Sequence, residues 1–172
     1  MSTLLAWHDF FLLTGTAGAT LLGLVFVAAS IAAAIPNEKL GNDASGSLWV
    51  LPIVYAFVRV LVVSALGLIP GQTWTLFGYL LSVLGVLDLG RIALNISGMR
   101  SFHRTRERFS MRDWWFYVVY PLLATLTLAT TGVALAMGWP FPVQLLAAGL
   151  LGHLVIGVHN SWELAHWLAT RQ

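Results

Sequence analysis

An uncharged stretch near the start of the chain runs from Phe10 to Ile35 and reads FFLLTGTAGATLLGLVFVAASIAAAI. A helix of this length, rising 1.5 Å per residue, crosses the roughly 30 Å hydrocarbon core of a bilayer. Hydrocarbon offers no hydrogen-bond partners, so the segment has to be helical to satisfy its own backbone. No Lys or Arg precedes the stretch, and it is longer than the apolar region of a signal peptide. We therefore expect a membrane helix that is retained in the mature protein.

The rest of the chain repeats this apolar pattern. Of its 172 residues, 58% are hydrophobic and only 9% are charged, whereas soluble domains carry about 25% charged residues. This composition excludes a soluble enzyme, a disordered chain and a nucleic-acid-binding module. We predict an all-α polytopic protein with a single transmembrane domain over residues 1–172. Its bundle of five transmembrane helices is expected at about residues 7–35, 47–69, 73–97, 113–137 and 141–169.

Most of the basic residues lie in one predicted loop, 99–112, between the third and fourth helices. Under the positive-inside rule this loop is cytoplasmic, which puts the N-terminus outside and the C-terminus inside. We expect an integral protein of a bacterial inner membrane or an equivalent membrane. The loop arginines are candidates for contact with anionic lipid headgroups or with a cytoplasmic partner. They are Arg100, Arg104, Arg106, Arg108 and Arg112.

Several ionisable side chains lie within the predicted helices, where a charge costs about 2.5–3.5 kcal/mol on insertion scales. Measured from the cytoplasmic helix ends, they fall at matching depths of about 10–18 Å on three helices. We predict one connected polar cluster in the inner leaflet, with Arg91 paired to Glu163 and Asp88 paired to Arg59 or His159. The cluster either fixes the helix register or carries ions or protons. Its members are Arg59, Asp88, Arg91, Asn95, His159 and Glu163, with Tyr55 one turn before Arg59.

Two further histidine patterns suggest cofactors. Glu163-x-x-His166 matches one half of the di-iron motif of helix bundles, so His159, Glu163 and His166 form a candidate metal site. Gly149-x-x-x-His153 resembles the small-x-x-x-His pattern of bacteriochlorophyll-binding helices in light-harvesting polypeptides, which makes His153 a candidate pigment or haem ligand. A histidine satisfied within the core is the simpler interpretation, and no cofactor is firmly implied. The chain has no cysteine, which excludes disulfides and thiolate metal sites.

Small residues indicate where helices approach closely. Gly15, Ala19 and Gly23 share one face of the first helix, and Gly149 and Gly157 lie on the fifth. We favour packing within the chain over a dimer seam for each face. In the fourth helix, Pro121 removes one backbone hydrogen bond and is expected to cause a kink.

The two ends of the sequence resemble a known type of protein. The first helix carries WHDFF at 7–11 and TAGATLLGLVFV at 16–27, and the fifth closes with HNSWEL at 159–164. These motifs are similar to the ends of small five-helix bacterial membrane proteins of unknown function. The resemblance implies the same kind of fold, and no activity comes with it.

These observations lead to three functional hypotheses. The first is a non-enzymatic subunit or scaffold of a homo-oligomer or larger membrane complex, since no soluble domain and no catalytic motif is present. The second is translocation of protons, ions or a small solute through the polar cluster. The third is a metal-dependent membrane enzyme. The expected partners are the lipid bilayer and other membrane subunits or copies of the chain, without nucleic acid.

Overall fold

The computed structural model describes residues 4–34, 45–103, 114–139 and 143–170. All regular secondary structure within these ranges is helical, and five helices are long and apolar enough to cross a membrane. The predicted all-α fold with five such helices is therefore confirmed. In chain order the elements are the 3-10 turn η1 (Leu4–Trp7), α1 (His8–Ala34), α2 (Ser45–Gly67), α3 (Trp74–His103), the π-helical turn η2 (Trp115–Val119), α5 (Tyr120–Ala136) and α6 (Gln144–Thr170).

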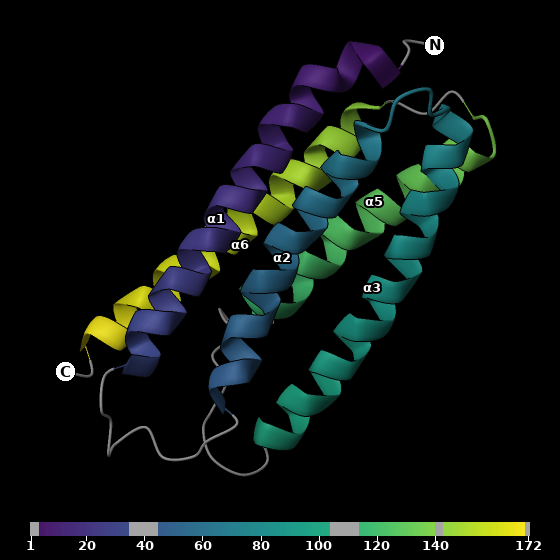
Figure 1. Cartoon of the computed structure of the whole chain (residues 1–172). Helices are drawn as coiled ribbons and strands as arrows, with labels where there is room; N and C mark the ends of the chain where they lie inside the picture. The colour runs from purple at the N-terminus through teal and green to yellow at the C-terminus, as the bar shows by residue number, and fades with distance from the viewer. Residues whose placement is uncertain (1–3, 35–44, 104–113, 140–142, 171–172) are drawn as a thin grey trace.

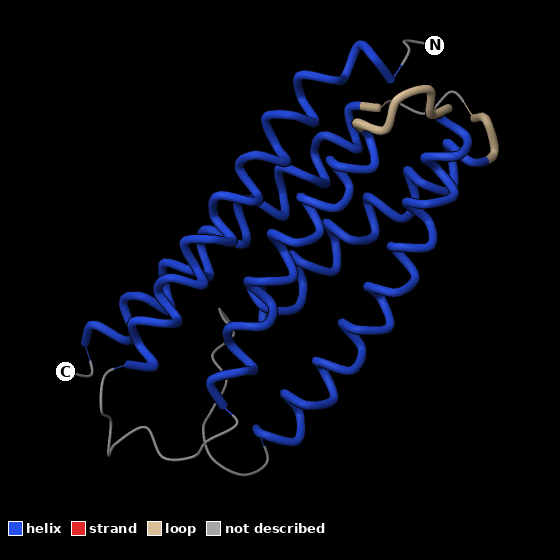
Figure 2. Tube along the Cα trace, in the orientation of Figure 1, coloured by secondary structure: helices blue, strands red, loops and turns tan. Residues whose placement is uncertain are grey.

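The helices run along one bundle axis and alternate in direction (Figure 1, Figure 2). We call one end of the bundle the turn end, because it holds the two short turns around Gly71 and Gly138. Both glycines have positive φ, at 72° and 69°, a backbone conformation that glycine adopts without steric cost. The opposite end, where α6 finishes, is called the C-terminal end. Because the five long helices alternate in direction, the start of α1 and the end of α6 lie at opposite ends of the bundle.

The third helix is longer than predicted. It was expected to end at residue 97 but continues to His103, so the predicted loop 99–112 begins inside a helix. The prediction was wrong because it rested on apolarity, which stops at the edge of the hydrocarbon. A helix satisfies its own backbone in water as well, and no proline occurs between Trp74 and His103.

Glycines bring α3 and α5 into close contact. A Cβ atom on Gly132 would lie 2.8 Å from the backbone nitrogen of Ser82 and 3.1 Å from the carbonyl oxygen of Gly78. A Cβ atom on Gly78 would in turn lie 2.7 Å from the carbonyl oxygen of Gly132. The two backbones touch directly at this crossing, as small-residue interfaces in membranes allow.

The small residues of α1 behave only partly as predicted. Gly15 packs against Ser64 of α2, whose hydroxyl shares a 2.8 Å hydrogen bond with Thr14. Gly18 also contacts the α2 backbone, whereas nothing lies within 4 Å of a Cβ placed on Gly23. The close approach therefore involves Gly15 and Gly18 and does not include Gly23.

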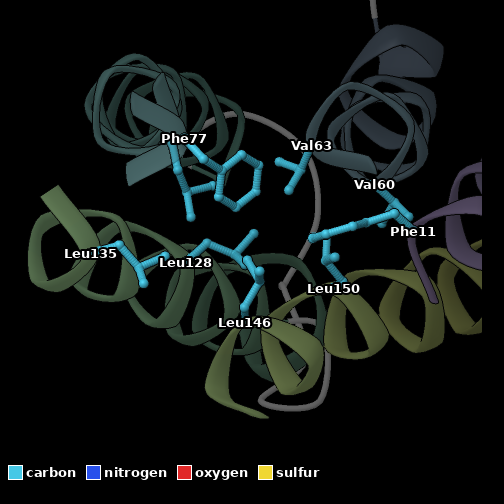
Figure 3. Close-up of a cluster of buried hydrophobic side chains, with 9 residues drawn as sticks. Phe11, Val60, Val63, Phe77, Leu128, Leu135, Leu146 and Leu150 are labelled. Carbon is cyan, nitrogen blue, oxygen red and sulfur yellow. The ribbon is translucent and has the colours of Figure 1, made fainter. Parts of the chain in front are cut away.

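A packed hydrophobic core fills the turn-end half of the bundle, and Figure 3 shows its side chains converging from neighbouring helices. Phe11 of α1 and Phe77 of α3 meet edge to face, with ring centroids 5.7 Å apart. The core comprises Phe11, Val60, Val63, Phe77, Leu81, Leu128, Leu135, Leu146 and Leu150.

The proline of the fourth membrane segment is accommodated by the π-helical turn η2. Tyr120 N–H donates to the carbonyl of Trp115, five residues back. The next bond of that pattern would join Phe116 to Pro121, which has no N–H. Asn160 of α6 supplies the missing donor, since its Nδ2 donates to the Phe116 carbonyl oxygen at 3.4 Å. The expected distortion at Pro121 is present, and it takes the form of a widened turn tied to α6.

Candidate functional site

An ion pair between α2 and α3 lies at the centre of the candidate site. Arg59 Nε pairs with Asp88 Oδ2, and the two side chains are 6% and 19% exposed. Asp88 Oδ1 also accepts a 3.1 Å hydrogen bond from Arg91 Nη2, one turn further along α3. One carboxylate therefore bridges two guanidinium groups. The sequence predicted an ion pair of Asp88 with either Arg59 or His159, and in the structure the partner is Arg59.

The same arginine reaches two more helices. Arg59 Nη1 donates to Thr125 Oγ1 of α5 at 2.7 Å and to His153 Nε2 of α6 at 2.5 Å. A guanidinium only donates, so His153 Nε2 is the acceptor and the ring proton lies on Nδ1. His153 Nδ1 then donates to the carbonyl oxygen of Gly149 at 2.8 Å. This buried network joins α2, α3, α5 and α6 through one side chain.

A cavity of about 170 Å³ lies beside this network, in the half of the bundle nearest the C-terminal end. It lies between α2, α3, α6 and the η2–α5 junction. The Arg91 guanidinium covers the ring of Tyr55, 3.6 Å from the ring centroid. The polar lining consists of Tyr55, Arg59, Arg91, Tyr117 and His153, and the apolar lining of Leu51, Pro52, Ala56, Ile92, Pro121 and Ile156.

The described residues around the cavity carry unequal charge. Arg59 and Arg91 supply two positive charges, Asp88 supplies one negative charge, and the hydrogen bonds of His153 fit its neutral form. In addition, Arg59 Nη2 is buried and has no hydrogen-bond partner in the described part of the chain. A donor without a partner and an excess positive charge are both costly away from water.

Two further predicted residues, His159 and Glu163, lie close together on α6. His159 Nε2 lies 3.4 Å from Glu163 Oε1 on the same helix, a long contact, and the His159 ring stacks on Phe116 at a centroid distance of 3.7 Å. Neither His159 nor Glu163 lines the cavity. The predicted single cluster also includes Asn95, whose side chain is not among those described, so it stays a prediction.

The predicted pair of Arg91 with Glu163 is not seen among the described residues, where the ion pair of Arg91 is with Asp88. The reason is the order of helices around the bundle. α3 packs mainly on α5 and to a lesser extent on α2, whereas α6 packs on α2, α5 and α1. The prediction used depth in the membrane, which is similar for Arg91 and Glu163. It did not use helix packing, and α3 and α6 share few contacts.

The cofactor hypotheses find no support in the geometry. No group of three or more His, Asp or Glu side chains in the described part of the chain could hold a metal, so His166 does not complete a site with His159 and Glu163. His153 is 1% exposed and both of its ring nitrogens are engaged, which leaves none to ligate a pigment or haem. The small size of Gly149 accommodates Leu128 of α5, whose Cδ2 would lie 2.6 Å from a Cβ atom placed there.

Some predicted residues lie outside the described residues or have undescribed side chains. The side chains of Asn95 and Arg100 belong to this set although their backbones are part of α3. Arg104, Arg106, Arg108 and Arg112 also lie outside the described residues. Their predicted roles therefore stay predictions.

Sequence reasoning missed two members of the site. Thr125 is one of several threonines in an apolar segment, and nothing in its spacing distinguishes it. His153 was interpreted most simply as a histidine satisfied within the core, and its two hydrogen bonds agree with that, but its contact with Arg59 was not predicted. Comparison of the sequence with protein-family models gives no match, and comparisons with curated proteins and with solved structures give none either. The resemblance at the two chain ends is thus neither supported nor contradicted.

Proposed function

We propose that this chain is a membrane protein that binds a small solute or ion in the cavity and carries it across the bilayer. The observation that carries the proposal is a cavity of about 170 Å³ lined by two arginines that share one carboxylate. Ionisable groups within a membrane helix commonly mark the path of a transported species. A network that served only to hold the helices together would have no need of an adjoining cavity.

The packing also suggests how access could change. The cavity occupies the C-terminal half of the bundle, and the hydrophobic core closes the turn-end half. α3 and α5 form one tightly packed pair, and α1 and α2 form another. The Arg59–Asp88 ion pair joins the two pairs, so a solute that competes for it would loosen one pair against the other.

Flux measurements test this proposal. We expect purified protein in liposomes to carry at least one member of a panel of protons, Na⁺, K⁺, Cl⁻ and small carboxylates. Asp88→Asn is expected to lower that flux by about tenfold or more, because it removes the only negative charge of the network. Glu163→Gln is the matched control, since Glu163 lies outside the cavity, and its flux should equal that of the wild type. Flux that survives Asp88→Asn, or no flux of any member, contradicts the proposal.

A subunit or scaffold role is the second candidate, favoured by an uncovered small-residue position on α1. Gly23 has open space at its Cβ, while Gly18 on the same helix already packs on α2. We expect the wild type in mild detergent to be larger than a monomer by native mass spectrometry. Gly23→Leu is expected to give a folded monomer by blocking close helix approach, whereas Gly18→Leu should damage the fold. A wild-type monomer without other subunits counts against this role.

We further propose a bacterial inner membrane with the N-terminus outside and the C-terminus inside, on the strength of the basic segment 99–112. In that orientation the cavity lies in the cytoplasmic half of the membrane. A reporter that is active only in the cytoplasm should be active when fused after Gln172. An inactive C-terminal fusion together with an active N-terminal one would reverse the orientation.

A further inference from the structure

We propose that the cavity binds a small organic monocarboxylate, with the carboxylate at Arg91 and Arg59 and a hydrocarbon body against the apolar wall. This inference rests on the proposed function and names its substrate class. The charge of the site is the first argument. The two arginines of the cavity lining share one carboxylate, Asp88, and a single bound negative charge would restore neutrality. The same excess positive charge disfavours a cation.

Free donors are the second argument. Arg59 Nη2 is buried without a hydrogen-bond partner, and the arginine is 7% exposed. Arg91 donates to Asp88 through Nη2, and this is the only hydrogen bond of its guanidinium among the described residues. A guanidinium edge presents two parallel N–H groups, which match the two oxygens of a carboxylate. The stacking of Arg91 on Tyr55 holds that guanidinium at the cavity wall.

The shape of the cavity supplies the third argument. The rest of its lining is mostly apolar and includes Leu51, Ile92 and Ile156. Inorganic phosphate or chloride would leave this wall unused. A dry cavity of about 150 Å³ accommodates benzene, so the 170 Å³ here is suited to a body of about six carbon atoms. The chemistry of recognition is therefore one carboxylate on a short apolar body.

Benzoate is the probe that we would use, titrated calorimetrically into the full-length protein in detergent. We expect saturable binding, and we expect benzyl alcohol and inorganic phosphate to bind at least about tenfold more weakly, because each lacks one half of the recognised chemistry. Equal binding of either comparison compound overturns the assignment. Displacement of benzoate by palmitate at equal concentration, with benzoate itself weak, assigns the cavity to a lipid tail and also overturns it.

Two variants locate the binding. Arg91→Gln is expected to weaken benzoate binding by at least about tenfold, because it removes the partly exposed guanidinium. Ile92→Phe keeps every charge but adds bulk to the apolar wall, and it should weaken binding as well. Glu163→Gln, outside the cavity, should bind like the wild type. Unchanged affinity in both Arg91→Gln and Ile92→Phe shows that benzoate binds elsewhere and refutes the inference.

The binding measurement tests the ligand class, and the flux measurement tests transport, so each can contradict its own proposal without the other. Benzoate binding that depends on Arg91, without any flux in liposomes, supports the ligand class and contradicts transport. Flux of another solute that depends on Asp88, without benzoate binding, supports transport and overturns the ligand class.

Discussion

Replacing Arg59 with methionine is expected to lower the free energy of unfolding by about 3–5 kcal/mol, the usual effect of removing one partner of a buried ion pair. Methionine retains the apolar length of the side chain but donates no hydrogen bonds. The change removes the only cross-helix ion pair of Asp88 among the described residues, and it leaves Thr125 and His153 Nε2 without their buried donor. Titration with a denaturing detergent, followed by tryptophan fluorescence, measures the loss.

Two further variants make this measurement specific. Arg91→Met removes a partly exposed guanidinium that bonds within its own helix, so its effect is expected to stay below about 1 kcal/mol. The double variant Arg59→Met with Asp88→Leu removes both buried charges, and it should recover part of the stability lost in Arg59→Met alone. An Arg59→Met protein as stable as the Arg91→Met protein would show that the network contributes little to folding.

Replacing Gly78 with valine is expected to cost about 3 kcal/mol and to separate α3 from α5. The new side chain would meet the backbone of Ala136 and the carbonyl oxygen of Gly132, and backbone atoms cannot move aside as a flexible side chain can. Since this crossing is the closest approach between the two helices, the change should also lower the proportion of folded protein after purification. The same detergent titration and the elution profile in size-exclusion chromatography measure it.

Gly90 provides the matched control on the same helix. A Cβ atom at Gly90 has nothing within 4 Å, so Gly90→Val is expected to change the free energy of unfolding by less than about 0.5 kcal/mol. The comparison separates the packing effect from the general effect of valine on a helix. Equal losses in the two variants would mean that the α3–α5 contact is not as close as described.

Much of the candidate site could be predicted from the sequence because charges are costly in a membrane. Arg59, Asp88 and Arg91 stand out in apolar segments, and their spacing along the helices predicts their depth. Depth follows from the rise per residue, which every α-helix shares. Because Arg59 and Asp88 have similar depths, Arg59 could be predicted as one of two possible partners of Asp88.

The predicted pairing of Arg91 with Glu163 is not seen among the described residues, for a different reason. Depth says nothing about which helices are neighbours or which way a face is turned. Gly78 and Gly132 bring α3 onto α5, and this placement turns Asp88 toward α2 and keeps Glu163 of α6 apart from it. The contribution of Asn160 to the turn at Pro121 depends on the same kind of long-range placement.

The number and membrane character of the helices can be inferred from residue order alone, because hydrophobicity and backbone hydrogen bonding act within each segment. The order of the helices, the Arg59–Asp88 ion pair and the cavity beside Arg59 exist only in the packed bundle. They depend on contacts between side chains far apart in the chain, such as Arg59 with His153, and on which helix backbones can touch. These contacts arise when the faces of all five helices are packed together, and no single segment encodes them.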